Sequence, residues 1–262
     1  EIFGHCLDLV IATNGDEIGE DLRVARISGS KYVNIDVSTP EGVARAKSMG
    51  AAKSGMIDVV ISSNFITTTQ LFGPKARGKM FALFRHPVER AVSMLYSSGY
   101  GDWGDENDME TIVYQIQEYA KIVNIENNWM VRSIVDKMDG YLTFDDLELA
   151  KEILRTKCLI GLVKEKEDSI KRFEKFYGWN DRARLPGVWE CEEKYTHWAW
   201  SNKKQHPDFE EGSEAYELLK SKNELDMELY EYAEVLFGQQ FSALGLDKED
   251  TKDSAMDDDG GI

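Results

Sequence analysis

The chain contains 262 residues, carries a formal net charge of −17 and has a pI near 4.7. This length is sufficient for one large α/β domain, and the acidic balance excludes a general nucleic-acid-binding protein, which needs a basic surface. Any site for an anion must therefore be a local basic pocket. No apolar run approaches the roughly 20 residues of a membrane helix, so we expect no membrane span in this segment.

The first third of the sequence predicts a mixture of helices and strands. Residues 1–11 place apolar side chains at helical spacing and predict a helix, and residues 14–30 are polar and Gly-rich and predict a loop. Strands are predicted over 32–37 and 57–62, on either side of a helix that begins near Pro40 and runs to Met49. The polar stretch 63–69 follows the second strand, at the edge where open α/β sheets bind ligands.

Residues 79–96 predict a strand, a tight turn and a helix start. Residues 80–84 are continuously apolar, as in a strand that is buried on both faces, and Pro87 suits the first position of a helix. Arg85 lies in the turn between them, where free backbone N–H groups and a guanidinium both favour an anion. This pattern indicates a phosphate site. The alternative from the local pattern is that Arg85 and Arg90 only pair with carboxylates.

The remaining elements follow the same patterns. Residues 109–123, 126–138 and 144–156 predict helices, residues 158–163 predict a third buried strand, and a helix follows to Trp179. The stretch 181–212 is irregular and rich in Trp, and residues 213–240 predict one long helix. Residues 246–262 are acidic and end in Gly, which predicts a disordered tail.

The three cysteines, Cys6, Cys158 and Cys191, form neither a disulfide framework nor a metal-binding signature. A disulfide between Cys158 and Cys191 is the alternative interpretation. Buried free thiols are the favoured interpretation.

The segment Arg-His-Pro-Val-Glu-Arg-Ala-Val-Ser-Met-Leu-Tyr, residues 85–96, resembles the 3′-phosphate-binding segment of sulfotransferases that use 3′-phosphoadenosine 5′-phosphosulfate (PAPS). The match rests on Arg85, Pro87, Arg90, Ser93 and Tyr96. His at position 86 departs from the commoner Asp, although it occurs there in some algal-type members. Softer similarity extends over roughly residues 31–240, which include a late strand–helix unit and a C-terminal helix.

The resemblance implies a P-loop-NTPase-like α/β fold in three layers, with a central parallel sheet flanked by helices, over residues 1–245. It implies that Arg85 and Ser93 hold the 3′-phosphate of PAPS, with Arg90 as a further cofactor-binding candidate. Lys203 and Lys204 lie where a basic loop closes over the nucleotide in this family. Arg132 lies in a helical segment that is similar to one downstream of the phosphate site, and it is the candidate for binding substrate.

The same resemblance implies transfer of a sulfuryl group to a hydroxyl, most plausibly of a carbohydrate, in the Golgi lumen. Two expected parts are missing from the sequence. A Lys-containing 5′-phosphosulfate loop is absent, since the nearest candidate, residues 27–31, precedes a predicted strand, and we expect that loop and a membrane anchor upstream of Glu1. The stretch 62–69 contains no His or Glu, so no catalytic base is assigned.

Three alternatives accompany the enzyme hypothesis. The missing loop and base also suit a sulfotransferase-fold protein without activity, which would serve as a binding or structural subunit. A P-loop kinase relative would need Mg²⁺-binding carboxylates at a strand end, and none is convincing. The pair Arg85–His86 is also found in histidine phosphatases, but these need Gly after the His and a second catalytic His.

Overall fold

The computed structural model describes residues 2–15, 19–97, 109–121, 127–198 and 209–245. The strands are β1 (Val10–Thr13), β2 (Val24–Ile27), β3 (Ser30–Asp36), β4 (Val59–Val60), β5 (Met80–Phe84) and β6 (Cys158–Leu162). The helices are α1 (Pro40–Ser48), α2 (Phe65–Thr69), α3 (Pro87–Ser97), α4 (Met109–Lys121), α5 (Trp129–Val135), α6 (Phe144–Lys157), α7 (Lys166–Tyr177), α8 (Asn180–Ala183), α9 (Val188–Glu193), α11 (Glu214–Lys222) and α12 (Glu224–Ala243). Short π- or 3₁₀-helical turns are η1 (Ile2–Cys6), η2 (Ala51–Lys53), η3 (Val163–Glu165) and η4 (Lys194–Trp198).

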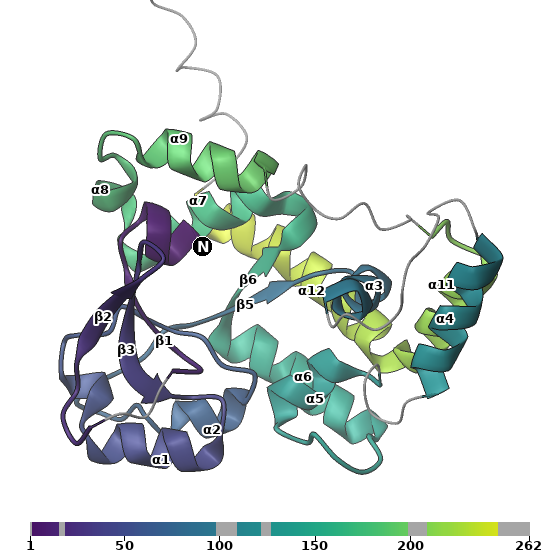
Figure 1. Cartoon of the computed structure of the whole chain (residues 1–262), viewed down its shortest axis with the longest axis horizontal. Coiled ribbons are helices and arrows are strands. Elements are labelled where there is room, and N and C mark those ends of the chain that lie inside the picture. Colours follow the sequence, from purple (N-terminus) through teal and green to yellow (C-terminus); the bar gives the residue numbers. More distant parts are fainter. Residues whose placement is uncertain (1, 16–18, 98–108, 122–126, 199–208, 246–262) are drawn as a thin grey trace, which may run out of the picture.

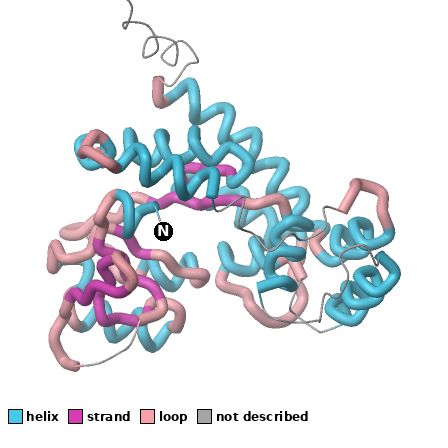
Figure 2. The backbone as a smooth tube through the Cα atoms, turned by 45° about the horizontal axis from the view of Figure 1, so that its top comes forward, coloured by secondary structure: helices cyan, strands magenta, loops and turns pink. Residues whose placement is uncertain are grey.

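The described strands form two separate sheets (Figures 1 and 2). The larger sheet has the order β2-β3-β1-β4, in which β1 runs parallel to β3 and β4, and β2 forms an antiparallel hairpin with β3. The smaller sheet is the parallel pair β5-β6. The prediction of a mixed α/β chain with parallel strands is confirmed. The single central parallel sheet is not observed among the described residues, where the parallel strands are divided between two sheets.

The β5-β6 pair is covered on both faces by helices. Met80, Ala82 and Phe84 share one face of β5 and join the core formed with α5, α6 and α12. Phe81 points to the opposite face, where its ring centroid lies 4.9 Å from that of Phe173 in α7. The period-two alternation of a strand therefore places one apolar set in each layer. Helices therefore pack against both faces of this pair, although Leu83 of β5 stays 52 % exposed.

Gly161 of β6 is required by this packing. A Cβ built on Gly161 would lie 2.5 Å from the ring of Phe173, which essentially no real contact allows. The glycine lets α7 approach the sheet closely, as glycines in strands often do. Any larger residue at position 161 would push α7 away from β6.

The larger sheet is packed mainly against α1. Val33, Ile35 and Val37 bury their side chains with Val43 and Ala46 of this helix. Thr39 caps α1, since its hydroxyl accepts a hydrogen bond from the Gly42 N–H at 3.0 Å, and Pro40 is the first helical residue. The predicted start of this helix is confirmed.

The predicted N-terminal helix over residues 1–11 is wrong. Only η1 is helical, and the chain then turns through Asp8, which has a φ of +51°, into β1. Leu9, Ile11 and Ala12 are buried because β1 lies between β3 and β4. A strand covered on both faces has no polar positions to reveal its period of two, so its apolar residues also fit the spacing of a helix.

The expectation of buried free thiols is wrong for two of the three cysteines and confirmed for the third. Cys6 in η1 forms a disulfide with Cys191 in α9, across a sequence separation of 185 residues. Cys158 is a buried free thiol, as predicted, and burial raises its pKa to about 12. The disulfide ties the N-terminal turn to the helices at the top of Figure 1.

The single long C-terminal helix predicted over 213–240 is two helices, α11 and α12, which are separated at Asn223. The side-chain amide of Asn223 donates to the Leu219 carbonyl at 2.8 Å, and its Oδ1 accepts from the Asn128 N–H at 3.1 Å. These bonds end one helix and tie the next to the start of α5. No helix in the described part of the chain is long and apolar enough to cross a membrane, and the predicted tail 246–262 lies outside the described residues.

Candidate functional site

The turn between β5 and α3 places Arg85 at the carboxyl end of a parallel strand. β5 ends at Phe84 and α3 begins at Pro87, as the sequence predicts. The first N–H groups of a helix have no acceptor inside that helix, and the aligned peptide dipoles make this end partially positive. Arg85 adds a guanidinium whose side chain is 15 % exposed. Strand and helix thus bring a fixed positive charge and free donors to one point.

Among the described residues, Glu89 is the carboxylate that pairs with Arg85. Its Oε2 lies 3.5 Å from the Arg85 Nε, one helical turn away, and the Glu89 side chain is 52 % exposed. Because the Glu89 carboxylate is largely in water, the pair is screened and contributes at most about 1 kcal/mol. Arg85 therefore keeps most of its capacity to bind an incoming anion, and Glu89 opposes that anion electrostatically.

Lys166 is a second cation at this edge. It begins α7, directly after η3 and the carboxyl end of β6, which pairs in parallel with β5 through Phe84 and Leu162. Burial, and next the nearby positive charge of Arg85, lower the pKa of Lys166. Two cations and the N-termini of two helices, α3 and α7, consequently gather at the ends of two adjacent strands.

Sequence reasoning missed Lys166 as a site residue. The sequence of the strand–helix unit that contains Lys166 indicates the fold and no binding role, because Lys166 lies far from Arg85 in the chain. The available signal was positional: each basic residue comes shortly after a buried apolar strand, and the carboxyl ends of parallel strands share one edge. Only the pairing of β5 with β6 makes the two positions neighbours.

His86 is partly buried and packs against α11 and α12. Its ring centroid lies 5.4 Å from that of Tyr230 in α12 and 6.1 Å from that of Tyr216 in α11. Burial lowers its pKa, although the carboxylates of Glu89 and Glu234 act in the opposite direction. A neutral imidazole packed on aromatic rings positions the turn that carries Arg85, and it adds no charge to the site.

The other two residues of the sequence motif differ in their surroundings. Ser93 is partly buried on α3 and lies one turn beyond Glu89, with no hydrogen bond for its hydroxyl among the described residues. The guanidinium of Arg90 lies 5.0 Å from the ring centroid of Trp129 in α5. This cation–π contact gives Arg90 a packing role between α3 and α5. The side chain of Tyr96 lies outside the described residues.

Arg132 is not placed to bind substrate, contrary to the expectation from sequence. Its side chain is buried, with a residue exposure of 4 %. Its guanidinium donates to the carbonyls of Asn127 at 2.7 Å, Lys137 at 3.0 Å and Gly140 at 2.9 Å. With a further bond from Nη2 to the Asn127 side-chain oxygen at 3.3 Å, these bonds use four of the five N–H donors of the guanidinium. Arg132 therefore holds together the loops on the two sides of α5.

The polar stretch after β4 makes structural hydrogen bonds. The Ser62 hydroxyl donates to the Val37 carbonyl at 2.6 Å, and the Asn64 side-chain amide donates to the Ser38 carbonyl. The Thr67 N–H donates to the Asp136 carboxylate at 2.5 Å. These contacts join the ends of β3 and β4 to α5 and nominate no catalytic base.

Two candidates from the sequence, Lys203 and Lys204, lie outside the described residues. Among the residues that the structure does describe, no cluster of three or more His, Cys, Asp or Glu side chains is arranged to hold a metal ion. The candidate site in the described chain is thus the edge formed by Arg85, from the sequence motif, and Lys166 beside it.

Comparison of the chain with protein-family models, with curated proteins and with solved structures finds no match.

Proposed function

We propose that the chain is a PAPS-dependent sulfotransferase that acts on a hydroxyl group, most plausibly of a carbohydrate. The observation that carries the proposal is the gathering of Arg85, Lys166 and the N-terminus of α3 at the carboxyl edge of β5-β6. In a chain with a net charge of −17, this local basic edge is the kind of place where an anionic nucleotide binds. The resemblance of residues 85–96 to a 3′-phosphate-binding segment supports the same assignment.

In this proposal, Arg85 donates two hydrogen bonds to the 3′-phosphate, and the first backbone N–H groups of α3 are further donors. The Ser93 hydroxyl, one turn further along the helix, adds a neutral hydrogen bond. Lys166 supplies a compact charge beside Arg85, either on the same phosphate or on the next one along the nucleotide. Glu89 releases Arg85 when the anion arrives, at the cost of a weak surface ion pair.

Sulfuryl transfer resembles phosphoryl transfer, in which catalysis consists mostly of positioning and of stabilising charge. The acceptor hydroxyl attacks sulfur in line, the S–O bond to the 5′-phosphate of PAPS breaks, and 3′-phosphoadenosine 5′-phosphate (PAP) leaves with the electron pair. The acceptor proton goes to a base that none of the described residues identifies. The residues described above therefore account for donor binding and not for proton transfer.

The Cys6–Cys191 disulfide supports a location in an oxidising compartment. The Golgi lumen, where carbohydrate sulfotransferases of the resembled kind act, is such a compartment. We include this location in the proposal.

The second candidate is a sulfotransferase-fold protein that binds a nucleotide or a partner without catalysis. The hydrogen bonds of Ser62 and Asn64 to backbone carbonyls favour this second candidate, because they give residues 62–69 a structural role in place of a catalytic one. This candidate predicts binding of PAP without turnover of PAPS.

The test is a transfer assay with PAPS labelled with ³⁵S and a panel of glycans that differ in their free hydroxyls. The parent chain is compared with Arg85→Ala and with the control Arg155→Ala, which removes an exposed arginine paired with Glu152 on α6. The enzyme hypothesis predicts labelled glycan with the parent and the control, and at least a tenfold loss with Arg85→Ala. Binding of PAP without labelling of any glycan supports the second candidate, and the absence of both overturns the proposal.

A further inference from the structure

One cavity in the described chain lies between the two sheets. It has a volume of about 410 Å³ and is lined by both β4 and β5, through Val59 and Val60 on one side and Met80 and Phe81 on the other. It lies at the start of β5, whereas Arg85 follows the end of this strand. Five residues of extended chain separate the two places by about 16 Å. The cavity is therefore distinct from the proposed phosphate site.

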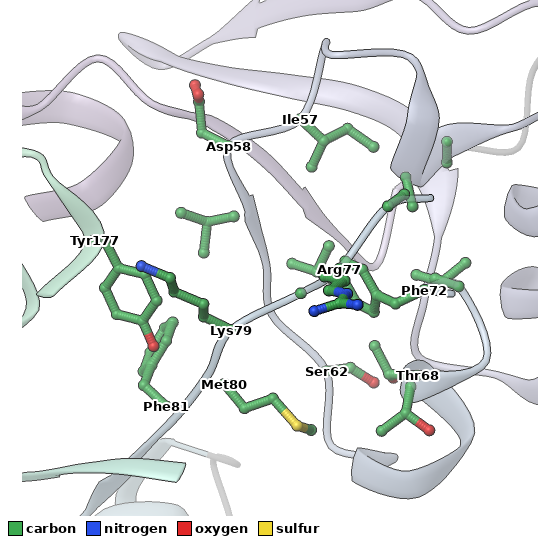
Figure 3. A pocket seen from close by; sticks show the side chains of 18 of the residues that line it. Ile57, Asp58, Ser62, Thr68, Phe72, Arg77, Lys79, Met80, Phe81 and Tyr177 are labelled. Carbon is green, nitrogen blue, oxygen red and sulfur yellow. The ribbon is translucent and has the colours of Figure 1, made fainter. Parts of the chain in front are cut away.

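The walls of this cavity are largely apolar and aromatic (Figure 3). Phe72 and Leu71 follow α2, Phe81 belongs to β5, and Tyr177 and Trp179 come from the end of α7 and the residues after it. The rings of Tyr177 and Trp179 stack with their centroids 4.8 Å apart, which gives one wall a fixed flat surface. Cavities of this size and lining suit small organic molecules.

Arg77 is the unpaired charge of the cavity. Figure 3 shows its guanidinium among the lining side chains, between Lys79 and Phe72. Arg77 is exposed and has no ion pair or hydrogen bond with any described residue.

The other two charged residues of the lining are already engaged. Asp58 accepts a hydrogen bond from the Val10 N–H at 2.8 Å and lies 3.8 Å from the Arg182 guanidinium. Lys79 donates to the Phe176 carbonyl at 3.2 Å and lies 4.8 Å from the centroid of that ring.

We propose that this cavity binds a small amphipathic anion, which consists of a flat apolar body and one sulfonate, sulfate or carboxylate group. The apolar body occupies the space between the β4 and β5 side chains and lies against the Tyr177–Trp179 wall. The anionic group pairs with Arg77, whose planar fork matches two oxygens of such a group. The proposal is independent of the sulfotransferase proposal, because it uses none of the residues at the Arg85 edge.

Charge complementarity selects this class of ligand over neutral or cationic ones. A neutral body of the same shape gains the apolar contacts but leaves Arg77 unpaired, and a cation is repelled by it. Because Arg77 is exposed to water, its contribution decreases as salt screens the pair.

Calorimetric titration with 2-naphthalenesulfonate tests the proposal, beside the uncharged 2-naphthalenemethanol. The variant Arg77→Ala removes the pairing group, and Lys75→Ala removes an exposed neighbouring cation that does not line the cavity. We expect single-site binding of the sulfonate by the parent and by Lys75→Ala, and at least tenfold weaker binding by Arg77→Ala. The neutral compound should bind parent and Arg77→Ala alike.

Saturation with PAP and the variant Arg85→Ala should each change the affinity for the sulfonate by less than twofold, which separates this site from the phosphate site. Equal affinity of Arg77→Ala and the parent would overturn the proposal. So would the absence of binding by the parent at millimolar sulfonate, or strong competition by PAP.

Discussion

Glu89 limits the affinity that the Arg85 edge can reach for an anion. Its carboxylate lies within 3.5 Å of the Arg85 guanidinium and would face a bound phosphate. The substitution Glu89→Gln keeps the shape and removes the charge, so we expect PAP to bind about two- to fivefold more tightly at low salt, the scale of one screened surface charge. Titration calorimetry at two salt concentrations measures this gain, which should shrink at high salt.

The control for Glu89→Gln is Glu217→Gln, since Glu217 is an exposed carboxylate on α11 that lies 3.9 Å from Lys220. Both variants change the net charge by the same amount. An equal gain in the two variants would mean that only the overall charge matters, and the local account of Arg85 and Glu89 would be wrong.

Arg132 should matter for stability and not for ligand binding. The substitution Arg132→Met fills much of the same volume but leaves the carbonyls of Asn127, Lys137 and Gly140 without their donors. Unpaired buried acceptors are costly, so we expect the free energy of unfolding to fall by about 2–4 kcal/mol. Urea denaturation measures the loss. Arg155→Met, on the exposed face of α6, should cost less than about 0.5 kcal/mol.

At the scale of elements, α5 and α12 start by capping each other. Asp226 of α12 is fully buried and accepts hydrogen bonds from the Met130 and Val131 N–H groups, both at 2.9 Å. In return, the Asn128 side-chain oxygen accepts from the Leu225 and Asp226 N–H groups at 2.8 and 3.1 Å. Asn128 has a left-handed φ of +53°, a conformation that Asn tolerates better than most residues. These reciprocal hydrogen bonds fix the start of α5 relative to α12, which also packs against α3.

The capping carboxyl predicts a specific dependence of stability on pH. Burial raises the pKa of Asp226 from 3.8 to about 6, although its two N–H donors and the charges of Arg90 and Arg132 act in the opposite direction. Between these two values the folded chain binds more protons than the unfolded chain. The contribution of this group is therefore complete below about pH 4 and is lost as the pH rises through about 6.

The variant Asp226→Asn does not titrate and serves as the reference. We expect the parent to lose up to about 3 kcal/mol of stability relative to the variant between about pH 4 and pH 7. Denaturation of both chains across this range measures the difference. A difference that stays constant with pH would show that Asp226 is ionised in both states.

Most elements are predictable from the sequence where a local signal marks both ends. The β5–α3 unit is correct because a short apolar run is followed by Pro87, and α6 is correct because Thr143 and Asp146 form a capping box. The break between α11 and α12 was missed, although Asn223 is the kind of residue that interrupts helices. Its role depends on the backbone of Asn128, which lies 95 residues away.

At the scale of the whole molecule, the Cys6–Cys191 disulfide closes most of the chain into one loop. A crosslink over so long a loop restricts the unfolded chain strongly, so the double variant Cys6→Ser, Cys191→Ser should lose about 2–5 kcal/mol of stability. Calorimetry with and without reductant checks this. Reductant should lower the Tm of the parent and leave that of the variant unchanged, and an unaltered parent would contradict the pairing.

The features that the sequence did not predict are those that depend on contacts between distant segments. The disulfide, the division of the strands into two sheets and the neighbourhood of Arg85 and Lys166 all arise from pairings across many residues. Local periodicity carries no information on which strands pair. The turn that carries Arg85 is predicted correctly, whereas Arg132, which was expected to bind substrate, donates its hydrogen bonds to backbone carbonyls.

The central claim is that the edge formed by Arg85, Ser93 and the start of α3 binds the 3′-phosphate of a nucleotide. Calorimetric titration of PAP into the parent and into the double variant Arg85→Ala, Ser93→Ala tests it most directly. Charge-assisted bonds of this kind contribute about 1.5–3 kcal/mol each, so the account predicts one binding site in the parent and at least a tenfold weaker site in the variant. Equal binding by both chains, or none by the parent, would contradict it.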